Sequence, residues 1–130
     1  MCSSDLGHKI RGLLQQKSGA HSLAVDSFKK VISLCKNDGA AYAGLGVSLL
    51  FLKRYEEAIQ MLKKSITYSR HNDIWYQVLN MALMYEEMGR NEDALDTLSW
   101  PLDLADRHPF IIPNQIKVKF EEKIFELDKP

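Results

Sequence analysis

The chain has 130 residues, of which 45% are hydrophobic, and its 17 basic side chains balance its 17 acidic ones. This length predicts one domain with enough apolar residues to bury a core. A balanced charge provides no bulk field that would attract nucleic acid or an anionic membrane. The longest apolar run, around Leu49 to Leu52, is far too short to span a bilayer.

The first six residues do not fit the periodic pattern of the rest of the chain. Residues 1–6 show no helical stripe and resemble the translation of a common sequencing adapter. We therefore expect them to be a non-native or disordered leader, which would make the native protein longer than this chain. The alternative is a short native leader whose Ser and Asp side chains cap the first helix.

Apolar residues at helical spacing predict six helices before residue 108. Gly19 and Gly89 suit the left-handed conformation in which many helices end. Asn91 precedes two acidic residues and is expected to be an N-cap. The predicted ranges are 8–18, 22–35, 40–53, 56–69, 74–88 and 92–104.

The C-terminal part contains prolines and an ambiguous last segment. Pro101 is expected to kink or end the sixth helix near Trp100, because proline lacks an N–H and collides with the preceding turn. Residues 114–127 show both a strand-like alternation and a helical stripe. A lone strand would have no sheet to join, so we expect a helix that caps an exposed helical face.

Three stretches of the chain repeat one local pattern. Ala24, Ala58 and Ala94 are separated by 34 and 36 residues. Four residues after each alanine there is a large apolar residue: Phe28, Leu62 and Leu98. Twelve residues before each alanine there is a small residue: Gly12, Gly46 and Ala82. A period of this length indicates stacked helical hairpins. The small residues are expected where two helices cross closely.

The second stretch resembles the tetratricopeptide repeat (TPR) family, and the other two match it less completely. Its matching positions are Tyr42, Leu45, Gly46, Leu49, Tyr55, Ala58, Leu62 and Ile66. The resemblance implies an all-α, helical-hairpin solenoid of about three TPR units with a C-terminal capping helix. The expected divisions are a TPR domain over 7–108, with units near 7–38, 39–72 and 73–106, and a link and capping helix over 109–130.

The resemblance also implies a concave groove, lined by the first helix of each unit, that accepts a peptide or a helix. The groove residues carried over to this sequence are Lys9, Leu13, Lys17, Ala43, Val47, Leu50, Phe51, Tyr76, Leu79, Asn80, Leu83, Glu86 and Glu87. This set predicts an apolar strip with a basic end in the first unit and an acidic end in the third. An amphipathic helix or extended apolar segment is the expected ligand.

Two alternatives bear on this groove. Leu50, Phe51 and Leu83 could instead pack between neighbouring helices, or the tail helix could fill the groove. The chaperone-binding clamp of some TPR domains is disfavoured, because Leu13 and Gly44 occupy clamp positions and offer no side-chain donor.

No residue pattern indicates catalysis, a metal or a cofactor. The four histidines are scattered without ligand spacing, and neither a phosphate-binding loop nor a nucleophile elbow is present. Cys2 and Cys35 are too few for a disulfide framework, and Cys35 is expected to be a buried thiol. A cytoplasmic location is expected, since no signal peptide is recognisable.

The predicted function is therefore a non-enzymatic adaptor or scaffold for a protein or peptide partner, without cofactor, nucleic acid or membrane. The alternative is a structural segment, or the regulatory arm, of a longer TPR-containing protein or enzyme with no ligand of its own.

Overall fold

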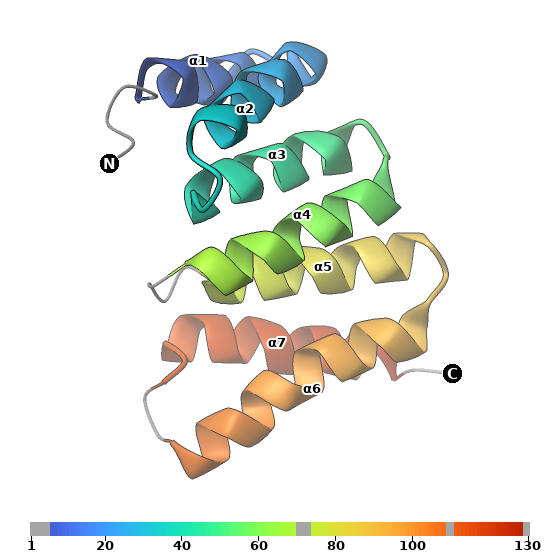
Figure 1. Ribbon diagram of the computed structural model, residues 1–130. Coiled ribbons are helices and arrows are strands. Elements are labelled where there is room, and N and C mark those ends of the chain that lie inside the picture. The colour runs from blue at the N-terminus through green and yellow to red at the C-terminus, as the bar shows by residue number, and fades with distance from the viewer. Residues whose placement is uncertain (1–5, 70–73, 109–110, 129–130) are drawn as a thin grey trace. The chain divides into compact units, whose positions relative to one another are not determined.

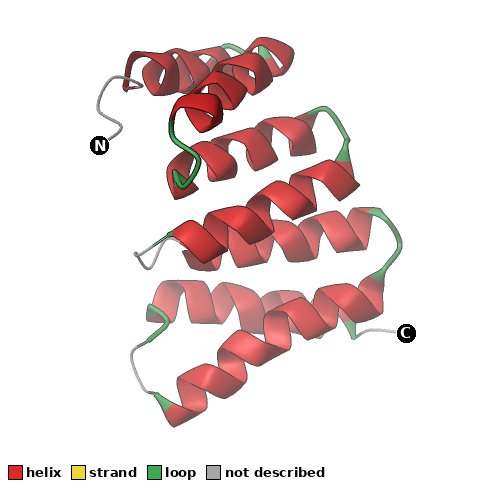
Figure 2. Ribbon diagram, in the orientation of Figure 1, coloured by secondary structure: helices red, strands yellow, loops and turns green. Residues whose placement is uncertain are grey.

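The computed structural model describes residues 6–69, 74–108 and 111–128, and all regular structure in these ranges is helical (Figures 1 and 2). The helices are α1 (Leu6–Lys17), α2 (His21–Leu34), α3 (Gly39–Phe51), α4 (Tyr55–Tyr68), α5 (Ile74–Glu87), α6 (Asn91–Arg107) and α7 (Asn114–Leu127). The six predicted helices are confirmed, with every boundary within three residues of its prediction. The tail is helical, as its stripe indicated, and α1 begins at Leu6, the last residue of the expected leader.

The helices form two compact units, Met1–Ser69 and Arg70–Pro130. In the first unit, each helix packs against the next one in the chain, and α1 also reaches α3 (Figure 1). In the second unit, α5 and α6 form a hairpin and α7 contacts both of them. None of the helices in the described ranges is long and apolar enough to cross a membrane.

Small residues allow close helix crossings in the first unit, as the sequence predicted. A Cβ added at Gly46 would come within 2.7 Å of Leu62 and 3.2 Å of the Ala58 carbonyl oxygen. A Cβ at Gly12 would come within 2.8 Å of the Phe28 ring. Real Cβ atoms essentially never come within 3.0 Å of another heavy atom, so the contacts with Leu62 and Phe28 show that glycine lets α1 meet α2 and α3 meet α4.

The three hairpin turns each contain one residue in the left-handed backbone conformation. Gly19 and Gly89 have positive φ angles of 85° and 76°, as expected for residues that end helices. Lys53 takes the equivalent place after α3, with a φ angle of 62°. In all three turns, the N–H of this residue donates to the carbonyl oxygen three residues earlier.

Three local predictions differ from the structure, one of them only in part. Helix α6 begins at Asn91, its N-cap is Arg90, and no side chain makes a cap hydrogen bond there. Of the two outcomes expected of Pro101, a kink or an end, the end does not occur: α6 continues to Arg107, and the Pro101 side chain is buried. Burial of this segment therefore outweighs the local cost of proline. Cys35 is half-buried, so the expectation that it is buried is wrong.

Candidate functional site

The predicted groove residues of the first compact unit, Met1–Ser69, lie on α1 and α3, two helices that contact each other. Leu13 is 51% exposed and Phe51 is 60% exposed. Lys17 is also exposed, whereas Ala43, Val47 and Leu50 are half-buried. The first unit therefore leaves large apolar side chains accessible to solvent at positions where the groove was predicted.

One face of the Phe51 ring is covered by a histidine. The rings of Phe51 and His21 are stacked, with centroids 4.4 Å apart and planes inclined by 4°. His21 is the first residue of α2, so this stack joins the end of α3 to the start of α2. The imidazole forms a flat partner for the phenyl ring and limits the directions from which a ligand could reach Phe51.

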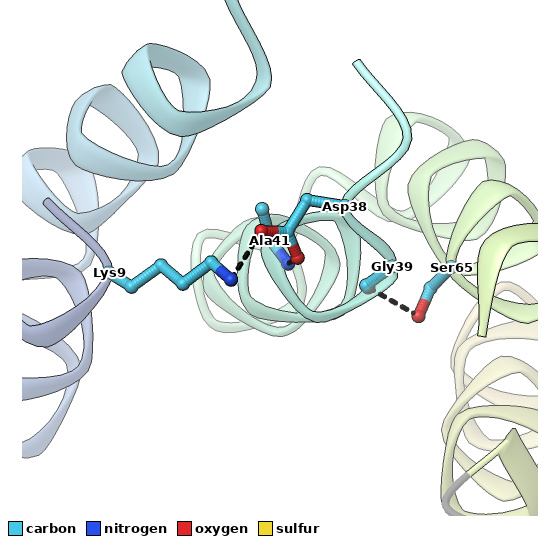
Figure 3. Close-up of polar contacts among 5 residues, drawn as sticks. All are labelled: Lys9, Asp38, Gly39, Ala41 and Ser65. Atoms are coloured by element: carbon cyan, nitrogen blue, oxygen red, sulfur yellow. Dashed lines mark hydrogen bonds and ion pairs between the residues drawn. The ribbon is translucent and has the colours of Figure 1, made fainter. Parts of the chain in front are cut away.

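Lys9, expected at the basic end of the groove, is engaged within the protein. Its ammonium group forms an ion pair with Asp38, whose side chain is only 9% exposed (Figure 3). Asp38 is the N-cap of α3 and also accepts a hydrogen bond from the Ala41 backbone N–H at 3.1 Å. One carboxylate therefore caps α3 and anchors α1 to it, which favours a structural role for Lys9.

The start of α3 is held from the other side as well. The Ser65 hydroxyl of α4 is buried and donates to the Gly39 carbonyl oxygen at 2.8 Å (Figure 3). A Cβ at Gly39 would come within 2.7 Å of the Ser69 hydroxyl oxygen and 3.1 Å of the Ser69 backbone nitrogen, so the start of α3 lies close to the end of α4. The first turn of α3 is thus tied to α1 by charge and to α4 by a buried hydrogen bond.

Gln16 provides a further link between the two groove helices of the first unit. Its side-chain amide donates to the Gly44 carbonyl oxygen at 2.8 Å and to the Ser48 hydroxyl at 2.7 Å. Ser48 is fully buried in α3. These bonds hold the C-terminal half of α1 on α3.

The predicted groove residues of the second compact unit, Arg70–Pro130, lie on α5. Tyr76 is 45% exposed. Glu87 is exposed, and Leu79, Asn80 and Leu83 are half-buried. Helix α7 contacts two positions of this set. Lys119 lies over the Tyr76 ring at 5.7 Å from its centroid, and Lys123 forms an ion pair with Glu86 at 2.5 Å.

Lys123 is the centre of a small charge cluster. Its side chain is 16% exposed and lies 3.2 Å from the Glu126 carboxylate in addition to its contact with Glu86. The hydrogen bond to Glu86 raises the pKa of Lys123 above its ordinary value, partly opposed by burial and reinforced by Glu126. The ammonium group therefore stays protonated and holds α7 to α5.

The charged ends of the predicted groove are consequently different from the expectation. Lys9 is paired with Asp38 in the first unit, and Glu86 is paired with Lys123 in the second. A charge that is already paired contributes little to ligand steering, because a new partner must compete with the internal one. Of the predicted charged set, Lys17 and Glu87 are exposed, which leaves apolar contact as the main chemistry that this surface offers.

Within the described residues, no group of three His, Cys, Asp or Glu side chains is arranged to hold a metal ion. Sequence reasoning did not predict the contacts that Asp38 and Gln16 make with other helices. Nothing in the local sequence pattern pairs Asp38 with Lys9. The tail lysines Lys119 and Lys123 were also missed, because their partners are on another helix.

Comparison with known proteins agrees with this architecture. A family model described as tetratricopeptide repeat matches residues 39–72, the second of the predicted units. No curated protein sequence matches the chain at a significant level.

Several solved structures have the same fold. The N-terminal domain of stress-induced protein-1 (STI-1) from C. elegans is 16% identical with a TM-score of 0.80, over 98% of this chain and 97% of that one. PcrH, solved with the chaperone binding region of PopD, is 18% identical with a TM-score of 0.78, over 93% and 88% of the two chains. The second TPR domain of human RPAP3, solved with an HSP70 peptide, is 16% identical with a TM-score of 0.73, over 95% and 93%.

Proposed function

The chain belongs to the tetratricopeptide repeat family, and from this premise we propose that it is a non-enzymatic adaptor that binds a segment of a partner protein. Two of the solved structures that share its fold were determined with a bound region or peptide of another protein. The observation that carries the proposal to this chain is the accessible apolar surface of the first unit, where Leu13 and Phe51 are 51% and 60% exposed.

The proposed ligand is an apolar or amphipathic segment. Leu13 and Phe51 supply exposed apolar surface, and Val47 and Leu50 add half-buried aliphatic side chains on α3. Burial of apolar surface is the dominant favourable term in most protein associations. Because Lys9 already has an internal partner, affinity should depend on apolar contact and decrease only modestly with added salt.

A peptide selection tests this proposal. Displayed random peptides are selected on the purified protein, and the affinity of the enriched peptide is then measured by calorimetry. Leu13→Ala and Phe51→Ala should each weaken binding about tenfold, the effect of losing more than 1 kcal/mol of contact. Lys63→Ala, at an exposed position of α4, is the control and should leave the affinity unchanged.

Circular dichroism of each variant shows whether helix content is retained, so that a lost contact is separated from a lost fold. Selected peptides that bind the Leu13 and Phe51 variants as tightly as the original protein would remove the basis for the proposed surface.

The second candidate function is a structural segment whose own tail occupies the α5 surface. The contacts of Lys119 and Lys123 with Tyr76 and Glu86 favour it for the second unit. However, Glu86 and Gln16 occupy equivalent positions, because each stands four residues after the small residue of its repeat, Ala82 or Gly12. Gln16 links α1 to α3, and Glu86 links α5 to α7, so each connects the first helix of a hairpin to the helix that follows the hairpin. This equivalence favours α7 as a further helix of the array over α7 as a bound ligand.

Hydrogen exchange distinguishes the two candidates for the second unit. If α7 occupies a ligand site, a bound peptide should displace it, and amides of residues 114–127 should lose protection when the peptide is added. If α7 is part of the array, their protection should be retained or increase.

A further inference from the structure

The first helix exposes an apolar stripe that differs from the predicted groove. Leu6, Ile10 and Leu14 are 60%, 48% and 61% exposed. They are spaced four residues apart and therefore lie along one side of α1. Ile10, Leu14 and the exposed Arg11 line a shallow hollow. Large side chains exposed together in this way are typical of surfaces that another protein covers.

The charge of this stripe restricts its partner. The sequence of α1, LGHKIRGLLQQK, contains basic residues but no acidic one. If two copies paired through this same stripe, Arg11 would come close to cations of the other copy, and such like-charge contact is destabilising. The stripe therefore fits an apolar partner surface with acidic side chains at its border.

The last helix carries a surface of that kind. Phe125 is 67% exposed and lines a shallow hollow together with Glu121, Glu122 and Glu126. Val118, 50% exposed, lies along the same side of α7, one helical turn before Glu122 and two before Phe125. This surface combines an aromatic side chain with a border of carboxylates.

We propose that this protein self-associates, with the α1 stripe (Leu6, Ile10, Arg11 and Leu14) of one copy bound to the α7 surface (Val118, Glu121, Glu122 and Phe125) of a second copy. The Phe125 ring packs against Ile10 and Leu14, and the bordering carboxylates face Arg11. Apolar burial supplies the affinity, and the opposite charges exclude pairing of like surfaces.

This contact is heterologous, because it joins two different surfaces. Each added copy still presents one unused surface of each kind, so assembly can continue beyond a dimer unless it closes into a ring. The surfaces are separate from Leu13 and Phe51, so self-association and the proposed peptide binding can be tested independently.

Sedimentation velocity of the full chain over a wide range of concentrations tests the proposal. The wild-type sedimentation coefficient should rise with concentration. Arg11→Glu and Glu122→Arg should each weaken association by about tenfold or more, because each places like charges across the contact. Leu14→Ser and Phe125→Ser should weaken it as well, and all four positions are exposed, so helix content should be retained.

Mixing the two charge variants gives the specific signature. In an equimolar mixture, the acidic α1 stripe of the Arg11→Glu variant faces the basic α7 surface of the Glu122→Arg variant. The unchanged α7 surface of the first variant likewise faces the unchanged α1 stripe of the second, so association should return to the wild-type level. Lys63→Glu and Asp96→Arg, which reverse exposed charges on α4 and α6, are the controls and should associate as the wild type does.

A wild-type chain that stays monomeric at every concentration would overturn the proposal. So would association that persists in both charge variants, or that their mixture fails to restore, since a different surface would then be responsible. Binding of the selected peptide by an Arg11→Glu variant tests the proposed function separately.

Discussion

The ring of Phe28 in α2 lies against the backbone of Gly12 in α1, so that a Cβ at residue 12 would come within 2.8 Å of the ring. Phe28 is only 2% exposed. Gly44 of α3 meets the same ring, and a Cβ there would also overlap with it. One phenyl ring is thus enclosed by glycines of two helices, and the positions of α1 and α3 on α2 depend on the missing side chains.

Replacing Gly12 with alanine should therefore destabilise the protein, although alanine favours helix formation. Overpacking of a filled core typically costs about 1–3 kcal/mol, which exceeds the gain of about 1 kcal/mol in helix propensity. Gly7→Ala is the matched control in the same helix, because a Cβ at Gly7 meets nothing within 4 Å. Urea unfolding should show a loss for Gly12→Ala and a small gain or no change for Gly7→Ala. Equal effects of the two changes would contradict the packing of Phe28.

Lys53→Gly should stabilise the protein. Lys53 has a φ angle of 62°, where the equivalent residues of the other two turns, Gly19 and Gly89, are glycines. A side chain in this left-handed region costs about 1 kcal/mol, and glycine avoids that cost. Thermal unfolding should show a higher midpoint for Lys53→Gly, whereas Lys53→Ala, which keeps the Cβ, should resemble the wild type. If Lys53→Ala stabilised as much as Lys53→Gly, the lysine side chain and not the backbone would be the cause.

Asp38 combines two functions that substitutions can separate. Asp38→Ala removes both the cap of α3 and the partner of Lys9, and loss of an N-cap alone costs about 0.5–2 kcal/mol. Asp38→Asn keeps an oxygen acceptor for the Ala41 N–H but removes the charge, so its free energy of unfolding should fall between those of Asp38→Ala and the wild type. Asp26→Ala, an exposed change on α2, should have little effect. Loss of stability of the same size in the Asn and Ala variants would assign the whole effect to the ion pair.

The pairing of Lys123 with Glu86 predicts a dependence of stability on alkaline pH. Because the pKa of Lys123 in the folded protein is raised above its ordinary value of 10.5, its contribution is fully present below that pH and is lost as the pH rises through the raised pKa. Lys123→Met should therefore be less stable than the wild type at neutral pH, with a difference that narrows at strongly alkaline pH. Urea unfolding of the two proteins across this range measures it. A constant difference would show that packing of the lysine stem, not its charge, is responsible.

Most of the helical architecture could be predicted from local patterns. The stripe through Ile116 and Phe120 indicated a helix in the tail, and both residues are buried in α7. The recurrence of Gly12 and Gly46 before Ala24 and Ala58 indicated close helix crossings, which the space around both glycines confirms. These predictions succeed because helical periodicity and the spacing of small residues are properties of neighbouring positions in the chain.

The candidate site was less predictable, since its polar contacts join residues on different helices. The groove positions carried over from the family placed Lys9 and Glu86 at the ends of a ligand site, but each has an internal partner, Asp38 and Lys123. Pro101 likewise lies within a continuous helix, because burial of its side chain outweighs its local preference. Periodicity specifies which side of a helix is apolar, but which charges meet depends on the angle and offset at which two helices pack, and those follow from the fit of the whole core.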